Sequence, residues 1–87
     1  MRTEKELWEL VLSRQDLFED GICNWAWSVH ENGLMTFHEY DRLMNMLDLN
    51  DFNIDKYNFL YWFKPYELQP RIDWINERIK QLENETI

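Results

Sequence analysis

Nucleophilic or metal-bound chemistry in this chain would depend on Cys23, His30 and His38, its one cysteine and two histidines. Cys23 and His30 are seven positions apart, which on one helix is ~10 Å and beyond the reach of a hydrogen bond. The sequence contains no CxxC, no HExxH and no Gly-rich phosphate loop, and its histidines lack a companion at zinc-ligand spacing. We therefore expect Cys23 to be a packed thiol and expect no metal site.

General acid–base catalysis would need two carboxylates that face one cleft. Glu39 and Asp41 are candidates, but two positions apart on a helix they point in different directions. The alternating oxygen side chains of Asp51, Asn53 and Asp55 resemble the first half of a calcium loop. Lys stands at position 56 where that loop needs Gly, and Trp at position 62 where it needs Glu. We therefore expect a solvated acidic loop, no enzyme activity, no catalytic residue and no cofactor.

The composition describes one small globular domain spanning residues 1–87. Hydrophobic residues make up 45% and aromatic residues 16% of the chain, far from the composition of disordered proteins. Nine basic residues against 17 acidic residues give a net charge of −8. This charge repels phosphate, so it argues against direct binding to nucleic acid or an anionic membrane and favours a partner with a basic surface.

A cytoplasmic location is expected from the cysteine usage and the hydropathy pattern. A single cysteine forms no intramolecular disulfide and fits a reducing compartment. No apolar block of signal-peptide length follows the charged start, and no run approaches the ~20 apolar residues that span a bilayer.

Two capping boxes and a glycine stop predict the first three helices. Thr3 with Glu6 predicts a helix start, and the apolar stripe behind it continues to Phe18. A second helix is predicted after an Asp20 cap, with its end at Asn32-Gly33. Its expected apolar face comprises Ile22, Ala26 and Val29, with Trp25 close beside it. Thr36 with Glu39 predicts a third helix, which runs to about Asp48, with Met35 and Tyr40 as a hydrophobic staple. Its expected core-facing stripe comprises Phe37, Tyr40, Leu43, Met44 and Leu47.

Residues 49–69 are expected to form an irregular, aromatic-rich connection that leads to a last helix. Pro70 suits the first turn of that helix, and the tail 83–87 is expected to fray. The fold class is therefore all-α, a compact bundle of about four short helices. The last helix carries a narrow apolar seam, which either packs within the chain or pairs with a second copy. The seam comprises Ile72, Ile75, Ile79 and Leu82.

Charge and aromatic residues are unevenly distributed. Between Asp16 and Asp55 there are nine acidic residues and one basic residue, so this stretch carries the whole net charge of −8. Such a surface imitates a row of phosphates, or else it only keeps the protein soluble. Six of the ten residues from Tyr57 to Tyr66 are aromatic; they either anchor a partner or fold back as a lid over the core. The candidate partner-binding residues are Trp27, Asp48, Asp51, Asp55, Tyr57, Tyr61, Trp62 and Tyr66, with Trp27 and Trp62 expected to be partly exposed.

Four short segments together resemble a loose class of small acidic proteins encoded by tailed bacteriophages. The resemblance spans most of the chain, but its motifs are helix caps and core aromatic residues. It implies an accessory protein that acts in the infected bacterial cytoplasm and inhibits a host defence protein, including inhibitors of the anti-CRISPR type. The class has no site motif, so the resemblance assigns no functional residue. The segments are Gly21-Ile22-Cys23, Met35-Thr36-Phe37 with Glu39-Tyr40, Tyr61-Trp62-Phe63, and Arg71-Ile72 with Trp74-Ile75.

Two hypotheses follow. The first is a non-enzymatic protein that binds and inhibits a host protein, such as a CRISPR nuclease complex, through aromatic anchors inside an acidic rim. In its sharper form the protein is a nucleic-acid mimic that occupies a basic groove. The alternative is a structural or assembly protein that forms a homodimer through its last helix.

Overall fold

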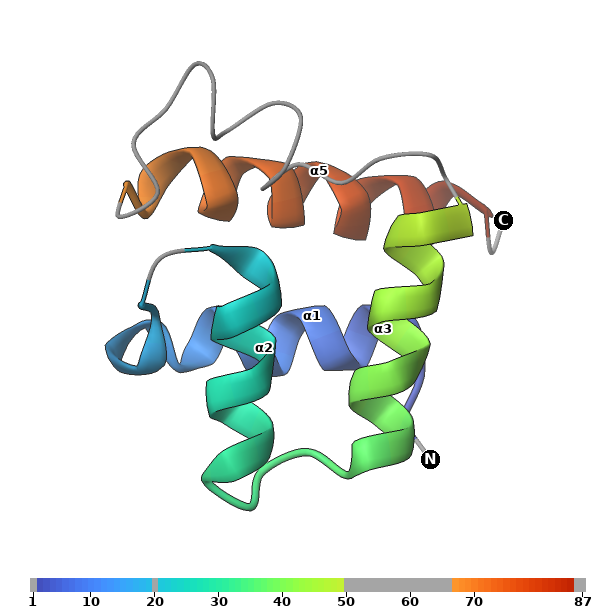
Figure 1. Cartoon of the computed structure of the whole chain (residues 1–87). Coiled ribbons are helices and arrows are strands. Elements are labelled where there is room, and N and C mark those ends of the chain that lie inside the picture. Colours follow the sequence, from blue (N-terminus) through green and yellow to red (C-terminus); the bar gives the residue numbers. More distant parts are fainter. Residues whose placement is uncertain (1, 20, 50–66, 86–87) are drawn as a thin grey trace.

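The computed structural model describes residues 2–19, 21–49 and 67–85, and in these ranges the protein is an all-α bundle of four helices. Figure 1 shows α1 and α5 running in opposite directions one above the other, with α2 and α3 as an antiparallel pair that crosses them. The helices are α1 (Glu4–Ser13), α2 (Ile22–Glu31), α3 (Phe37–Leu49) and α5 (Gln69–Glu85), and a short 3₁₀ turn, η1 (Gln15–Leu17), follows α1.

The start of α1 is the predicted capping box. The Glu6 N–H donates to Thr3 Oγ1 at 3.2 Å, and the Thr3 N–H donates to Glu6 Oε1 at 2.9 Å. The helix ends at Ser13, so the predicted continuation to Phe18 is wrong. At Arg14 the backbone leaves the helix, and its carbonyl accepts the indole N–H of Trp25 at 2.9 Å. The end of α1 therefore coincides with a hydrogen bond from a residue eleven positions further along the chain.

The second helix buries the predicted face, with Ile22, Trp25, Ala26 and Val29 all inaccessible to solvent. Its N-cap is Gly21, which supplies no side-chain hydrogen bond, and not the predicted Asp20, which lies outside the described residues. The helix therefore begins one residue later than an Asp20 cap predicts, at the first residue of the apolar face.

The predicted stop at the end of α2 is confirmed. Gly33 has a φ of +77°, the left-handed region that glycine occupies without strain. Its N–H donates to the His30 carbonyl, and the Leu34 N–H donates to the Val29 carbonyl, at 2.9 and 3.2 Å. These two bonds form a Schellman motif, which satisfies carbonyls that the end of the helix would otherwise leave unpaired.

The core contains two tryptophans with their polar atoms satisfied. Trp8 and Trp25 are fully buried, and the indole N–H of Trp8 donates to Glu4 Oε2 at 2.9 Å. A buried indole without a partner would lose the hydrogen bond it makes to water, so these bonds favour the packed state. Around them pack Leu7, Val11, Ile22, Val29, Met35, Leu43, Met46, Leu47 and Ile75.

The apolar seam of α5 packs within the chain. Ile75 is fully buried, and Ile72, Ile79 and Leu82 pack against the core. Arg78 forms an ion pair with Glu4 at 2.7 Å, which joins α5 to α1. Residues 83–85, where the tail was expected to fray, continue the helix to Glu85. No helix within the described ranges is both long enough and apolar enough to cross a membrane.

Candidate functional site

Five aromatic side chains of α2 and α3 form a connected cluster at the protein surface, which we call the aromatic face. The ring centroids of Trp27 and Tyr40 are 5.1 Å apart, as are those of Trp27 and His30. Phe37 lies 6.1 Å from His30 and 6.4 Å from Tyr40. These spacings are typical of attractive contacts between aromatic rings. The aromatic face comprises Trp27, His30, Phe37, His38 and Tyr40.

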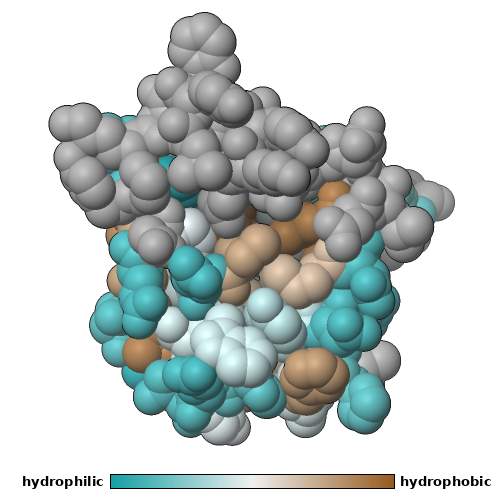
Figure 2. Space-filling view, viewed as in Figure 1, coloured by the Kyte–Doolittle hydropathy of each residue, from teal (hydrophilic) through white to brown (hydrophobic). Residues whose placement is uncertain are grey.

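The aromatic face contains the two large hydrophobic side chains that are exposed in the described part of the chain. Trp27 is 38% and Phe37 is 56% accessible to solvent. Figure 2 shows pale and brown surface over α2 and α3, with hydrophilic side chains at both edges. Apolar surface that stays in contact with water does not stabilise the fold of the isolated protein. When such surface gathers in one patch with a polar rim, it marks an interaction surface.

A carboxylate and a phenol add polar groups to the aromatic face. The indole N–H of Trp27 donates to Glu31 Oε1, one turn further along α2. Burial raises the pKa of the Tyr40 phenol, and the nearby Cys23 and Asp41 add to the shift. Tyr40 therefore remains a neutral hydrogen-bond donor at physiological pH.

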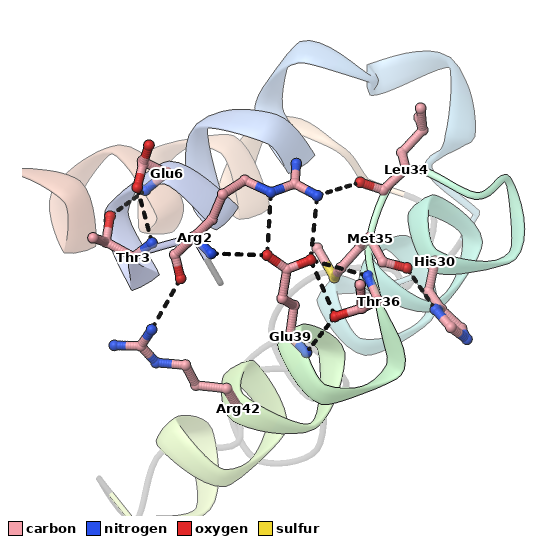
Figure 3. Close-up of polar contacts among 9 residues, drawn as sticks. All are labelled: Arg2, Thr3, Glu6, His30, Leu34, Met35, Thr36, Glu39 and Arg42. Atoms are coloured by element: carbon pink, nitrogen blue, oxygen red, sulfur yellow. Dashed lines mark hydrogen bonds and ion pairs between the residues drawn. The ribbon is translucent and has the colours of Figure 1, made fainter.

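The loop between α2 and α3 is held by a different element at each of three consecutive residues. The Leu34 carbonyl accepts Arg2 Nη2 at 2.7 Å, and the Met35 carbonyl bonds His30 Nδ1 at 2.7 Å. Since a carbonyl only accepts, Nδ1 of His30 carries a proton. The Thr36 N–H donates to Glu39 Oε1 at 3.0 Å. Figure 3 shows these contacts. Together they fix how α3 leaves the loop, and so position Tyr40 beside Trp27 and Phe37 beside His30.

Glu39 is the centre of this arrangement. Its carboxylate is 4% exposed and receives hydrogen bonds from Arg2, from the Thr36 N–H and from the Thr36 hydroxyl. The Glu39 N–H donates in turn to Thr36 Oγ1 at 3.1 Å, which completes the predicted capping box. The Thr36 backbone bond, and after it the bonds from Arg2, lower the pKa of Glu39 from 4.5 to about 2 although burial opposes the shift. The Glu39 carboxylate is therefore ionised at physiological pH, and it holds Arg2 against the start of α3.

The predicted partner-binding residues are only partly within the described ranges. The partial exposure predicted for Trp27 is confirmed. Asp48 lies in α3, but its side chain is outside the described part. The remaining candidates lie outside the described residues: Asp51, Asp55, Tyr57, Tyr61, Trp62 and Tyr66.

Sequence reasoning missed Phe37 as a surface residue. It fits the period of the core stripe of α3, but it stands on the first residue of the helix. There its side chain lies beyond the buried Leu43 and Leu47 and remains exposed. Its position immediately after the Thr36 cap was the one available signal, because a side chain at the end of a helix has fewer neighbours than one in the middle.

Within the described ranges, the acidic residues of the stretch 16–55 do not form one uninterrupted surface. Glu39 is buried against Arg2, and Asp16 is paired with Arg14 at 2.9 Å. Of the other acidic residues with described side chains in this stretch, Glu19, Glu31 and Asp41 are exposed. Two of them, Glu31 and Asp41, lie beside rings of the aromatic face.

The candidate reactive and metal-ligating side chains do not form a metal site in the described ranges. Cys23 is half-buried in α2, seven positions before His30. Within the part of the chain that the structure describes, no three His, Cys, Asp or Glu side chains come close enough together to hold a metal ion. Comparison of the chain with protein-family models, with curated proteins and with solved structures found no match to any of them.

Proposed function

We propose that this protein is a non-enzymatic binding module that attaches to another protein through its aromatic face. One observation carries the proposal: Trp27 and Phe37, the large hydrophobic residues left exposed in the described ranges, lie in one network of ring contacts. Tryptophan and tyrosine contribute large contact areas with few rotatable bonds, so they dominate the energetics of protein interfaces.

The acidic residues at the edge of the face support a partner with a basic surface. Glu31 and Asp41 provide negative charge there, and it would accelerate encounter with such a partner. The phage resemblance extends the proposal to a host defence protein in the bacterial cytoplasm as the partner, inhibited by this binding. The nucleic-acid-mimic form of the hypothesis receives less support, since Glu39 is removed from the surface by Arg2.

The alternative of a homodimer through the last helix also receives less support. Its seam residues pack against the core of the same chain, with Ile75 fully buried. A dimer through this seam would require α5 to separate from α1, and so to break the Glu4–Arg78 ion pair and the Trp8–Trp74 ring contact.

The test is quantitative affinity capture from bacteria that express the tagged full-length protein, read by mass spectrometry. The double variant Trp27→Ala/Phe37→Ala is compared with the wild type and with Glu9→Ala, an exposed substitution on α1. Thermal unfolding of each variant verifies the fold. Proteins enriched by the wild type and by Glu9→Ala, and lost from the double variant, would support the proposal. Equal enrichment by all three proteins would overturn it.

A further inference from the structure

Trp27 and Glu31 place an exposed indole beside a carboxylate. Trp27 is 38% accessible, and its N–H donates to one oxygen of Glu31. A carboxylate has about four acceptor positions, so this bond leaves Glu31 capacity for further donors. Tryptophan is the aromatic residue that attracts cations most strongly. The pair therefore combines both features that recognise a planar cation, a ring surface and an acceptor at its edge.

The position of Glu31 is unfavourable for the stability of α2. It is the last residue of this helix, where a negative charge opposes the helix dipole. Replacing its carboxylate with an amide is therefore expected to leave the fold intact. Any effect of that replacement on binding then reports on the surface and not on stability.

Among the described residues, no Lys or Arg forms an ion pair with the exposed acidic side chains beside the aromatic face. Between residues 16 and 55 the only Lys or Arg is Arg42, and its Nη1 donates to the backbone carbonyl of Arg2 at 3.0 Å. Glu39 is neutralised by Arg2. Of the acidic side chains described on α2 and α3, Glu31 and Asp41 remain exposed, and this negative charge complements a basic ligand.

We propose that the aromatic face binds an arginine side chain of the partner, with the guanidinium stacked on Trp27 and paired with the carboxylate of Glu31. This inference rests on the proposed function and specifies the partner's chemistry as an exposed, arginine-bearing segment. Arginine fits better than lysine because its planar group stacks on a ring while its N–H groups bond a carboxylate. A lysine ammonium is more strongly hydrated and has no plane to stack.

The probe is a short, blocked peptide of alternating glycine and arginine, compared with the same peptide carrying citrulline or lysine in place of arginine. Citrulline keeps the planar shape and removes the charge. Binding to the full-length protein is followed by NMR through the indole N–H signals, with Trp27→Leu identifying the Trp27 signal. We expect the arginine peptide to shift that signal and to bind more tightly than the citrulline and lysine peptides.

Two substitutions and one control assign the contacts, with affinities measured by titration calorimetry because Trp27→Leu removes the reporting indole signal. Glu31→Gln and Trp27→Leu are each expected to weaken binding of the arginine peptide about two- to fivefold, the range for an exposed ion pair or cation–π contact. Glu77→Gln changes the net charge as Glu31→Gln does, but on the exposed surface of α5. It is expected to change the affinity less than Glu31→Gln does.

The outcomes separate this inference from the proposed function. Equal binding of the arginine and citrulline peptides, or equal effects of Glu31→Gln and Glu77→Gln, would overturn the arginine site. If the Trp27→Ala/Phe37→Ala variant still lost the partner in the capture experiment, the proposed function would stand with an apolar ligand for the face. If that variant retained the partner, the proposed function itself would fail.

Discussion

The guanidinium of Arg2 holds the carboxylate of Glu39 through two parallel hydrogen bonds, from Nε at 3.1 Å and from Nη2 at 3.2 Å. The backbone N–H of Arg2 adds a third bond at 3.0 Å. These contacts join residues 37 positions apart and attach the segment before α1 to the start of α3. The geometry of the aromatic face therefore depends on a residue near the beginning of the sequence.

Glu39→Gln is expected to lower the free energy of unfolding by about 2 kcal/mol. The neutral amide loses the charge-assisted hydrogen bonds from Arg2, and its own N–H groups cannot bond the N–H donors of that guanidinium. The value is smaller than for a fully buried pair since the Arg2 side chain is 39% exposed. Urea denaturation measures it. Glu77→Gln, an exposed control on α5, is expected to change stability by less than about 0.5 kcal/mol. Equal effects of the two substitutions would contradict this role for Glu39.

The contribution of Glu39 to stability is expected to disappear in acid. Its pKa in the folded protein is about 2, below its ordinary value of 4.5, so the ionised form is favoured by folding. The contribution is complete above pH 4.5 and is lost as the pH falls towards 2. The difference in unfolding free energy between the wild type and Glu39→Gln should therefore shrink across this range. A difference that remained constant between these two pH values would show that the carboxylate is not held as an anion.

Gly33→Ala is expected to destabilise the protein through the backbone alone. Gly33 has a φ of +77°, and a Cβ added there would meet no atom within 4 Å. The left-handed conformation costs an alanine about 1–2 kcal/mol, while asparagine tolerates it better. Thermal or urea unfolding should thus rank the glycine first, Gly33→Asn second and Gly33→Ala last. An alanine variant as stable as the wild type would contradict the Schellman geometry.

Two neighbouring tryptophans are expected to respond differently to truncation. Trp25 is fully buried, contacts Phe18 edge-on at 5.4 Å and donates its N–H to Arg14. Trp25→Ala is therefore expected to cost about 3–5 kcal/mol. Trp27→Ala removes a partly exposed ring and is expected to cost about 1 kcal/mol. Denaturation curves of both variants test this contrast. Equal losses would mean that Trp27 belongs to the core and is not a surface reserved for a partner.

Ile75→Ala is expected to lower stability by about 3 kcal/mol, because Ile75 is fully buried between α5 and the rest of the core. Because this seam packs within the chain, sedimentation velocity on the wild type should show a single species whose sedimentation coefficient does not change with concentration. A wild-type dimer that Ile75→Ala dissociates, without loss of monomer stability, would restore the homodimer alternative.

Local sequence signals located the starts of α1 and α3 and the end of α2. The Thr3–Glu6 and Thr36–Glu39 boxes and the stop at Gly33 are all found in the structure. Each of these motifs satisfies backbone groups within about one turn, so its outcome depends little on the rest of the chain. Helical periodicity likewise identified the buried face of α2, whereas in α1 it did not identify the buried Trp8.

Only the tertiary structure decided which of these residues reach the surface and which charges are neutralised. The Glu39 of a recognised capping box is also the buried partner of Arg2, and the sequence pattern counted it among the surface acids. Phe37 fits the apolar stripe but stands beyond the core, where it joins Trp27 in the aromatic face. The physical reason is that periodicity specifies the side of a helix that a residue occupies. How far along that side the neighbouring helices extend depends on packing between residues distant in the chain.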